Sequence, residues 1–376
     1  MSILGSFAGA LLEGRDPARA KVLRRSTRVA LPELEKWAER QTTPADTLVL
    51  EASGNAFAGA VRLRAMGRRV AILDSHQAGK VGKVYCANDR VDAVKIARIY
   101  LSGLAALVWQ PDPKTLERRE VFSAYQGVVK ESTRLKQQIK AMLNEHCLRL
   151  GKGFRLSHPT ALGRLGRLKA WSPVQAMLLE QLHGGLVAAR VRRKKLRHYM
   201  AQEILAQPEL LRLTRLCGIS LITLYGLSAA IGDVRRFSHS NKLVAYLGLN
   251  PSVCQSGNWE GGGALKRHGR GALRALLVQA AKRLLQVNNP LQKWGLSVAV
   301  RRGRNKAAVA VARKLCVAVW HLLQGHLIGA LERLDTLETK LGKLATELGL
   351  ATIKAQGYES KAAFIAQKLY LLKSYP

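Results

Sequence analysis

Residues 47–73 have the sequence TLVLEASGNAFAGAVRLRAMGRRVAIL, and this stretch decides the fold class of the N-terminal part of the chain. The short apolar run TLVL at 47–50 predicts a buried strand, and RVAIL at 69–73 predicts another. Residues 55–66 between them have the pattern of a helix, and Gly67 is well placed to end it. Strands interleaved with helices predict an α/β layer with a largely buried sheet.

The same alternation continues on both sides of this stretch. Residues 20–23 predict a strand, residues 31–40 an amphipathic helix, and residues 91–101 a further helix. We therefore assign residues 1–115 to one α/β domain.

The middle of the chain, residues 116–207, changes to long polar helices. One helix is predicted from residue 116 to about residue 150, and a second from about 174 to 207 carries the basic run 190–197. Apolar residues recur every seven positions in the first helix, at Val121, Val128, Leu135 and Met142. We expect an antiparallel helical arm whose apolar seam a second copy covers, so that the protein is a homo-oligomer.

The C-terminal part is predicted to be helical and rich in glycine turns. Residues 211–216 and 221–231 indicate two short helices around a tight turn at Gly218, so residues 208–325 form a domain with a helix-hairpin-helix-like segment. That turn presents backbone amides to a DNA phosphate, or is a bare helical turn. Residues 326–376 are predicted to be a helical tail with leucines in heptad spacing, at Leu334, Leu337, Leu341, Leu344 and Leu348.

Charge is the strongest compositional signal. The chain of 376 residues has 61 Lys and Arg against 25 Asp and Glu, a formal net charge of +36. Like charges at this density repel one another, and binding to a polyanion such as nucleic acid relieves the repulsion. Charge alone leaves a plain basic nucleic-acid-binding protein open.

The composition also indicates a reducing, non-membrane location. The five cysteines are scattered singly, which argues against zinc sites and disulfides and favours the cytoplasm. The apolar N-terminus lacks a basic region, so we expect no signal peptide. The apolar stretch 307–331 contains Arg313, Lys314, His321 and His326, and we expect a packed helix there instead of a membrane span.

Three carboxylates stand out in the α/β part. Glu51 directly follows the predicted strand 47–50, and Asp89 and Asp92 are spaced i,i+3 at a helix start, which puts both on one face. Carboxylates that converge in this way bind Mg²⁺ for phosphate chemistry. Alternatively, Asp89 is a helix cap, Asp92 a first-turn acid and Glu51 a surface charge.

A second candidate cluster lies at residues 251–274. It is predicted to be a glycine-rich basic loop in which Lys266, Arg267, Arg270 and Arg274 neutralise DNA phosphates. Ser256, which precedes Gly257, is either an exposed nucleophile or an ordinary turn serine.

In their order and spacing, seven segments resemble the DEDD-motif transposases of bacterial insertion sequences, a group that includes bridge-RNA-guided recombinases. The matching segments are 48–54, 88–93, 218–219, 232–237, 245–251, 255–257 and 266–274. The resemblance implies a RuvC/RNase H-like N-terminal domain, a coiled-coil middle and a helical C-terminal transposase domain.

The resemblance further implies the chemistry of the site. Glu51, Asp89 and Asp92 match the second to fourth Mg²⁺ ligands of the family, and Ser256 matches its nucleophile. It implies that the protein cuts and rejoins DNA through a phosphoserine, with a guide RNA as a further partner and with the metal site and the serine coming from different subunits.

The chain departs from the family pattern at its first strand. Residues 1–14 contain no aspartate, and Asp16 precedes a predicted turn, so it matches a turn position instead of the first ligand. We expect either a truncated or mis-started copy, or a substitution by Glu13 or Asp16. An inactive relic that keeps only the nucleic-acid surface is the alternative to an active enzyme.

Overall fold

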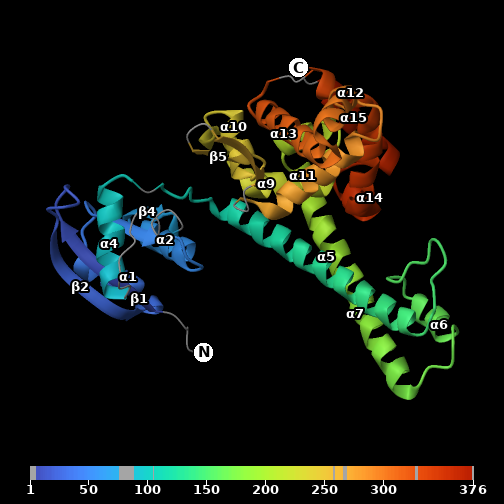
Figure 1. Ribbon diagram of the computed structural model, residues 1–376, viewed down its shortest axis with the longest axis horizontal. Coiled ribbons are helices and arrows are strands. Elements are labelled where there is room, and N and C mark those ends of the chain that lie inside the picture. Colours follow the sequence, from blue (N-terminus) through green and yellow to red (C-terminus); the bar gives the residue numbers. More distant parts are fainter. Residues whose placement is uncertain are drawn as a thin grey trace. The chain divides into compact units, whose positions relative to one another are not determined.

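The structure, a computed structural model, describes residues 6–75, 89–104, 106–256, 259–265, 269–326 and 329–374. The chain forms two compact units, Met1–Pro111 and Asp112–Pro376 (Figure 1). The first unit mixes strands and helices, and the second is mainly helical.

Two short sheets are described in the N-terminal unit. Strands β1 (Ser6–Glu13) and β2 (Lys21–Ala30) pair antiparallel, and β3 (Thr47–Glu51) and β4 (Arg69–Leu73) pair parallel. Helix α2 (Ala56–Ala65) connects β3 to β4, and Gly67 has a positive φ of 74° just after it, as predicted. The predicted strand–helix–strand order is confirmed, but β3 is only half-buried, so the expectation of a largely buried sheet is wrong for this strand.

Helices and strands of this unit pack together through small apolar clusters. The further helices are η1 (Leu31–Glu33), α1 (Leu34–Gln41) and α4 (Asp89–Leu101), and α4 contacts β1, β2 and β3. Leu34, Ala38 and Leu63 form one buried cluster, and separate clusters form around Ile72 and around Leu73 with Ile99. The N-terminal unit is therefore stabilised by several small cores.

Two long helices form the predicted arm. Helices α5 (Pro113–Glu145) and α7 (Pro173–Leu205) run antiparallel along one another, with the short helix α6 (Ala161–Gly166) in the connection at the far end (Figure 1). Each long helix begins with a proline, and the residue before that proline caps the helix. The Asp112 carboxylate accepts a hydrogen bond from the Thr115 amide, and Ser172 forms a capping box with Gln175.

The apolar seam of the arm is covered within the chain. Leu135 is buried in a cluster with Leu179 and Leu186 of α7, and a Cβ at Gly185 would lie 3.3 Å from the Leu135 side chain. Val128 is also buried. The expectation that this seam requires a second copy is wrong, because the returning helix of the same chain already removes it from solvent.

The body of the second unit surrounds one large core. Its helices are α8 (Pro208–Arg212), η2 (Leu213–Arg215), α9 (Leu221–Ile231), η3 (Val234–Arg236), α10 (Ser240–Tyr246), α11 (Gly271–Leu284), α12 (Gln292–Arg302) and α13 (Arg304–Leu323). Helix α9 lies at the centre, with every residue from Thr223 to Ile231 buried. A Cβ at Gly226 would lie 2.7 Å from Phe122 of α5 and from Leu273 of α11, so glycine allows these helices to pack closely around α9.

A β-hairpin interrupts the helices where a loop was predicted. Strand β5 (Pro251–Ser256) pairs antiparallel with β6 (Trp259–Leu265). The prediction of a glycine-rich loop is wrong here, since Gly261 and Gly262 occupy strand positions opposite Cys254 and Val253. Glycine has a low strand propensity, so these residues form a strand because they are paired with β5.

The C-terminal tail packs onto the same core. It consists of η4 (Gly329–Leu331), η5 (Leu334–Thr336), α14 (Leu337–Ala355) and α15 (Lys361–Ser374). The predicted heptad leucines of α14 are buried, whereas Leu334 is 37% exposed. Among the described residues, none of the helices combines the length and the apolar character that a membrane span requires.

Candidate nucleic-acid interface and catalytic residues

Glu51 lies at one edge of the parallel strand pair. It is the last residue of β3, is exposed, and pairs in register with Leu73 at the end of β4. The carboxyl ends of both strands therefore meet at this edge, which is the position the sequence predicted for a strand-end carboxylate.

The sequence interpretation missed a second acid at the same edge. Asp74 directly follows β4, is half-buried, and donates its backbone N–H to the Ala106 carbonyl at 3.1 Å. The signal was present in the sequence, because Asp74 follows the predicted strand 69–73 just as Glu51 follows 47–50.

The two predicted helix-start acids have only their backbone described. Asp89 and Asp92 lie in the first turn of α4, which packs against β1 and β3, but their side chains are outside the described residues. Within the described residues, three or more His, Cys, Asp or Glu side chains do not come together as a metal-binding group. The oxygen donors of Glu51 and Asp74 have the chemistry that Mg²⁺ prefers.

The first hairpin shows why Asp16 is a turn residue. Glu13 ends β1 and is exposed, and Asp16 lies in the turn that leads into β2. The Asp16 Oδ1 accepts a hydrogen bond from the Ala18 amide at 2.8 Å, and its other oxygen lies 3.8 Å from Nε of Arg19. The turn itself uses this carboxylate, as predicted from its position.

Ser256 occupies the tip of the β5–β6 hairpin. It is the last residue of β5 and pairs with Trp259, the first residue of β6, while Pro251 pairs with Leu265 at the base. Five residues of antiparallel strand place Ser256 about 17 Å from the base along the hairpin. Its side chain and Gly257 lie outside the described residues, as do the predicted phosphate ligands Lys266 and Arg267.

The segments that lead into and out of this hairpin are in close contact with each other. The Arg274 Nη1 donates a hydrogen bond to the Gly248 carbonyl at 3.2 Å. Gly269 has a φ of 105°, and a Cβ there would lie 2.9 Å from Gly248 N and from the Tyr246 carbonyl oxygen, so this position needs glycine. Arg274 and Gly269 thus join the segment after the hairpin to the segment before it, a structural role that the phosphate interpretation did not include.

Arg270 belongs to an arginine cluster around Tyr246 that the sequence did not reveal. The Arg270 Nε donates to the Tyr246 hydroxyl at 3.0 Å, and this hydroxyl donates to the Ala230 carbonyl at 3.2 Å. Arg119 of α5 donates to the Ala229 carbonyl at 3.0 Å, and Arg236 donates to the Ile231 carbonyl at 2.9 Å. Cations at the last carbonyls of α9 interact favourably with the negative end of its dipole.

The electrostatics of this cluster show its excess of positive charge. Burial raises the pKa of the Tyr246 phenol, but the guanidinium groups of Arg270 and Arg119 act in the opposite direction and hold that pKa below its ordinary value. Burial, together with positive charge on Arg270, lowers the pKa of Arg119 and of Arg236. The cluster therefore has a net positive charge at the end of α9, and Arg270 within it is exposed to solvent.

The predicted hairpin at Gly218 forms, but its backbone is engaged by the tail. Gly218 has a φ of 74° between η2 and α9. The Cys217 amide donates to the Leu331 carbonyl at 3.2 Å, and the Lys340 Nζ donates to the Thr214 carbonyl at 2.8 Å. The Cys217 amide is therefore taken by the protein, which supports a structural turn at this residue.

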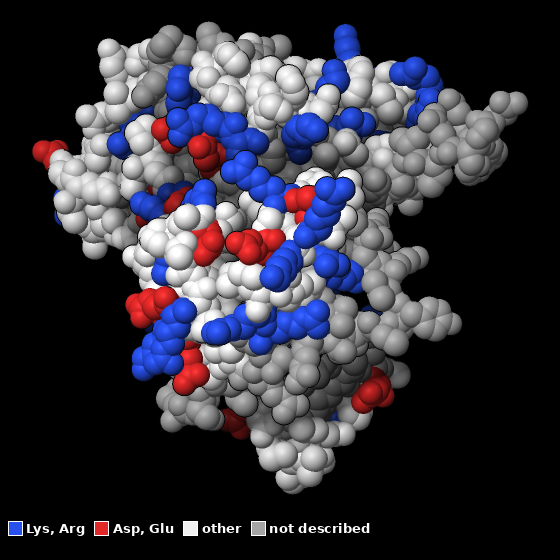
Figure 2. Space-filling model, turned by 90° about the vertical axis from the view of Figure 1, so that its left-hand side faces the viewer, with Lys and Arg blue, Asp and Glu red and all other residues white. Residues whose placement is uncertain are grey.

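Exposed basic side chains also follow α7 and spread elsewhere over the surface. Arg192 forms an ion pair with Glu131 of α5 at 2.7 Å, while Lys194 and Lys195 are exposed in the same run. Figure 2 shows Lys and Arg side chains spread over much of one face, with acidic side chains scattered among them. This surface has the charge that nucleic-acid phosphates attract.

Two family profiles match the segments that carry these features. Residues 13–148 match a family described as a transposase, DEDD_Tnp_IS110, and residues 211–294 match the transposase IS116/IS110/IS902 family. The chain belongs to the IS110/IS116/IS902 family of transposases. The first match contains Glu51, Asp89 and Asp92, and the second contains Ser256 and the arginines at 270 and 274.

Individual relatives agree with the family assignment. The chain is 28% identical over 244 residues to the transposase for insertion sequence element IS1111A of Coxiella burnetii, a match that covers 63% of this chain and 66% of that protein. It is 27% identical over 222 residues to the transposase for IS1328 of Yersinia enterocolitica, covering 55% and 64%. The chain thus spans just under two thirds of the length of these two relatives. A Pseudomonas aeruginosa protein named "Probable family 20 transposase" is 25% identical over 296 residues, and there the match covers 76% of this chain and 85% of the relative.

Proposed function

We propose that this protein is the transposase of an insertion sequence, which cuts and rejoins DNA with Ser256 as the nucleophile. The observation that carries the proposal is the position of Ser256. It lies at the tip of a β-hairpin whose flanking segments are joined through Arg274 and Gly269, in a chain of this transposase family. A hairpin tip gives a hydroxyl access to a DNA strand that a core position would deny.

In the proposed reaction, the Ser256 Oγ attacks a DNA phosphorus and loses its proton. The bond between that phosphorus and one sugar oxygen breaks, and the leaving hydroxyl takes up a proton. A hydroxyl of a second strand then attacks the phosphoserine, which restores Ser256 and joins the strands. We assign Lys266, Arg267 and Arg270, which follow the hairpin base in the sequence, to DNA phosphates away from the attacked one, because Ser256 lies about 17 Å from that base.

The carboxylates of the N-terminal unit would hold divalent metal. We propose Glu51, Asp89 and Asp92 as ligands, and we add Asp74 because it shares the strand edge of Glu51. Mg²⁺ bound there would lower the pKa of a bound hydroxyl and neutralise phosphate charge. Asp74→Asn should weaken binding of Mn²⁺, measured by its electron paramagnetic resonance signal. Asp46→Asn, which changes an acid bonded within its own turn, is the matched control.

DNA is the proposed substrate, and a guide RNA and a homo-oligomer are proposed partners on the basis of the family resemblance alone. The four segments keep their proposed roles: residues 1–115 the metal site, 116–207 the arm, 208–325 the DNA and serine domain, and 326–376 the tail. Because α7 covers the arm seam, an oligomer would have to form through another surface.

The decisive test is a covalent protein–DNA adduct. With insertion-sequence DNA, the associated RNA and Mg²⁺, the chain should form an adduct that survives a denaturing gel. Ser256→Ala should abolish the adduct and leave DNA binding within about twofold, because removing one hydroxyl keeps the basic surface intact. Ser252→Ala, in the same strand, is the matched control and should keep the adduct.

The second candidate function is that of an inactive relic that binds nucleic acid without cutting it. It is favoured by the absence of aspartate from strand β1, where the family resemblance implies the first metal ligand. Intact DNA binding without adduct in the wild-type chain would support the relic. An adduct that persists in Ser256→Ala would show that another residue is the nucleophile.

A further inference from the structure

The segment between Glu145 and Glu180, at the far end of the arm, is basic. Residues 146–179 contain no Asp or Glu, and six Lys and Arg residues. The six are Arg149, Lys152, Arg155, Arg164, Arg167 and Lys169. All except Lys169 are exposed. Positive charge at this end of the arm is therefore directed to solvent with no acid of the same segment to neutralise it.

This end of the arm is a packed cap. Leu156 and Leu165 are buried with residues of α5 and α7. The Trp171 Nε1 donates to the Leu165 carbonyl at 3.0 Å, a ring nitrogen of His183 lies 2.9 Å from the His158 carbonyl, and Arg190 donates to the Ser157 carbonyl at 3.2 Å. A fixed cap can hold a binding site, because its side chains lose little further freedom when a ligand binds.

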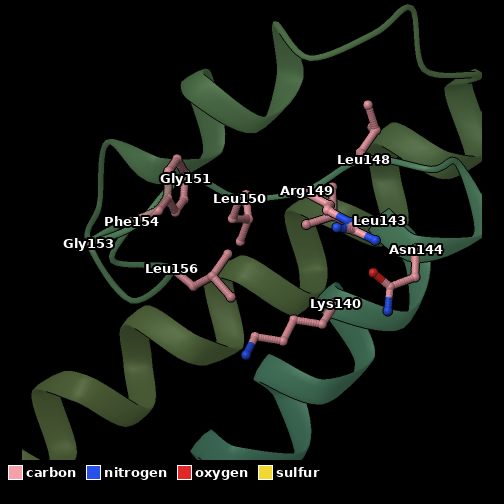
Figure 3. Close-up of a pocket in the computed structure, with 10 residues that line it drawn as sticks. All are labelled: Lys140, Leu143, Asn144, Leu148, Arg149, Leu150, Gly151, Gly153, Phe154 and Leu156. Atoms are coloured by element: carbon pink, nitrogen blue, oxygen red, sulfur yellow. The ribbon is translucent and has the colours of Figure 1, made fainter.

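A cavity of about 420 Å³ opens in this cap (Figure 3). Leucine side chains and Phe154 form its apolar wall, and Lys140, Asn144 and Arg149 supply its polar groups. In Figure 3, Phe154 lies on one side of the opening, and Arg149 and Asn144 lie on the other. Arg164 stacks on the Phe154 ring with its guanidinium carbon 4.6 Å from the ring centroid, which adds a third cation, outside the lining, to Lys140 and Arg149.

This combination matches the parts of a nucleotide. An apolar and aromatic wall suits a base, an amide suits the edge of a base, and two cations suit the phosphate. The volume lies within the range of small-ligand sites, roughly 300–1,000 Å³. A base paired in a duplex does not expose its faces to such a wall, so an unpaired nucleotide fits better.

We propose that this pocket binds one unpaired nucleotide of an RNA or DNA strand, and that the basic side chains around it contact the neighbouring phosphates. The site is distinct from Ser256. Helix α5 enters the core of the body at Phe122 and reaches the pocket at Lys140, about 27 Å farther along its axis. The proposal goes beyond strand transfer and does not require Ser256 to be active.

Cross-linking of the full chain to short oligonucleotides locates the site. The probes are a 12-nucleotide RNA with 4-thiouridine, the same sequence in DNA with 4-thiothymidine, and a blunt duplex of that DNA. The single strands should cross-link to peptides that contain residues 140–156, and the RNA and DNA arms show which strand is preferred. Cross-links that map only outside the arm, or a duplex that cross-links there as well as the single strands, would overturn the proposal.

Affinity measurements test the roles of the side chains. The double variant Lys140→Ala/Arg149→Ala should flatten the salt dependence of single-strand binding by about 1.4 in slope, since each phosphate contact contributes about 0.7. Lys361→Ala/Lys373→Ala removes two exposed charges from α15 and should leave the slope unchanged. Phe154→Leu should reduce the cross-link about five- to tenfold with the melting temperature kept, through lost stacking. Equal losses in the α15 control would refute a specific site.

Discussion

Each unit of the protein contains an Arg–Glu ion pair, and the two pairs differ in how far they are buried. In the N-terminal unit, Arg62 of α2 pairs with Glu35 of α1, and the two side chains are 38% and 32% exposed. In the C-terminal unit, Arg215 of η2 pairs with Glu332 of the tail at 2.6 Å, and both side chains are 7% exposed. Water screens the first pair and is excluded from the second, so burial decides how much each pair matters.

The cores differ in the same direction. The described residues of the N-terminal unit form three small clusters, whereas in the C-terminal unit one cluster joins the body to the tail, from Phe122 to Leu372. The tail is joined to the turn before α9 by an antiparallel bridge between Leu216 and Glu332 and by the Arg333 amide, which donates to the Arg215 carbonyl at 2.8 Å. The tail is thus part of the C-terminal unit and completes its core.

The largest expected effect comes from breaking the buried pair. Glu332→Gln should lower the free energy of unfolding by about 3–5 kcal/mol, because it leaves the Arg215 charge buried without its carboxylate. Denaturant unfolding measures the loss, and hydrogen exchange should place it in α8, α9 and α14. The double variant Arg215→Met/Glu332→Leu should lose much less, since no buried charge remains. A double variant that is as unstable as Glu332→Gln would contradict this explanation.

The next effect depends on pH and concerns Lys340. Burial lowers the pKa of this amine from 10.5 to about 8. Between pH 8 and 10.5 this amine therefore binds more protons in the unfolded than in the folded chain, so its own contribution to stability should rise with pH in this window by up to about 3 kcal/mol. Below pH 8 the amine is protonated in both states and contributes no slope. Lys340→Met should remove this contribution, measured as the difference in stability from the unchanged chain across the window, and Lys354→Met, at an exposed position of the same helix, should keep it.

A smaller effect is expected at the arginine cluster. Tyr246→Phe removes the hydroxyl that donates to the Ala230 carbonyl and accepts from Arg270. The expected cost is about 1 kcal/mol, because Arg119 and Arg236 still reach the end of α9. Thermal unfolding measures this cost. Tyr100→Phe, in the N-terminal unit, is a control for loss of a tyrosine hydroxyl, and a cost above about 3 kcal/mol for Tyr246→Phe would require a further role for its hydroxyl.

The smallest effect belongs to the exposed pair. The hydrogen bond from Arg62 outweighs the opposing effect of burial and lowers the pKa of Glu35 below its usual 4.5. Its stabilisation is present above pH 4.5 and is lost as the pH falls through the lowered value. Glu35→Gln should cost below about 1 kcal/mol, and less at high salt. A loss as large as that of Glu332→Gln would remove the contrast between the two units.

Local patterns predicted the elements of both units well. Strand β4 matches its predicted residues, α2 lies within one residue of its predicted ends, and α9 matches residues 221–231. The β5–β6 hairpin was missed because its glycines carry no strand pattern, and the order comes from pairing between strands.

The sequence predicted which kinds of residue form the candidate site better than it predicted how they are arranged in space. Glu51 lies at a strand end as expected, but Asp74 joins it there only because β3 and β4 pair in parallel with Glu51 opposite Leu73. Ser256 was placed in a loop and lies in a strand at a hairpin tip. The Tyr246 cluster draws arginines from positions 119, 236 and 270, and no local pattern connects residues so far apart.

The sequence by itself determined the charge, the helical arm, the leucine stripe of the tail and the family motifs, because these depend on composition, on periodicity and on short spacings. Only the tertiary structure decided which surfaces meet. It put α7 over the arm seam, so that this seam cannot serve a second copy, and it put the tail over the turn at Gly218. Burial and electrostatic contact act between residues that are distant along the chain, and a one-dimensional pattern does not specify those distances.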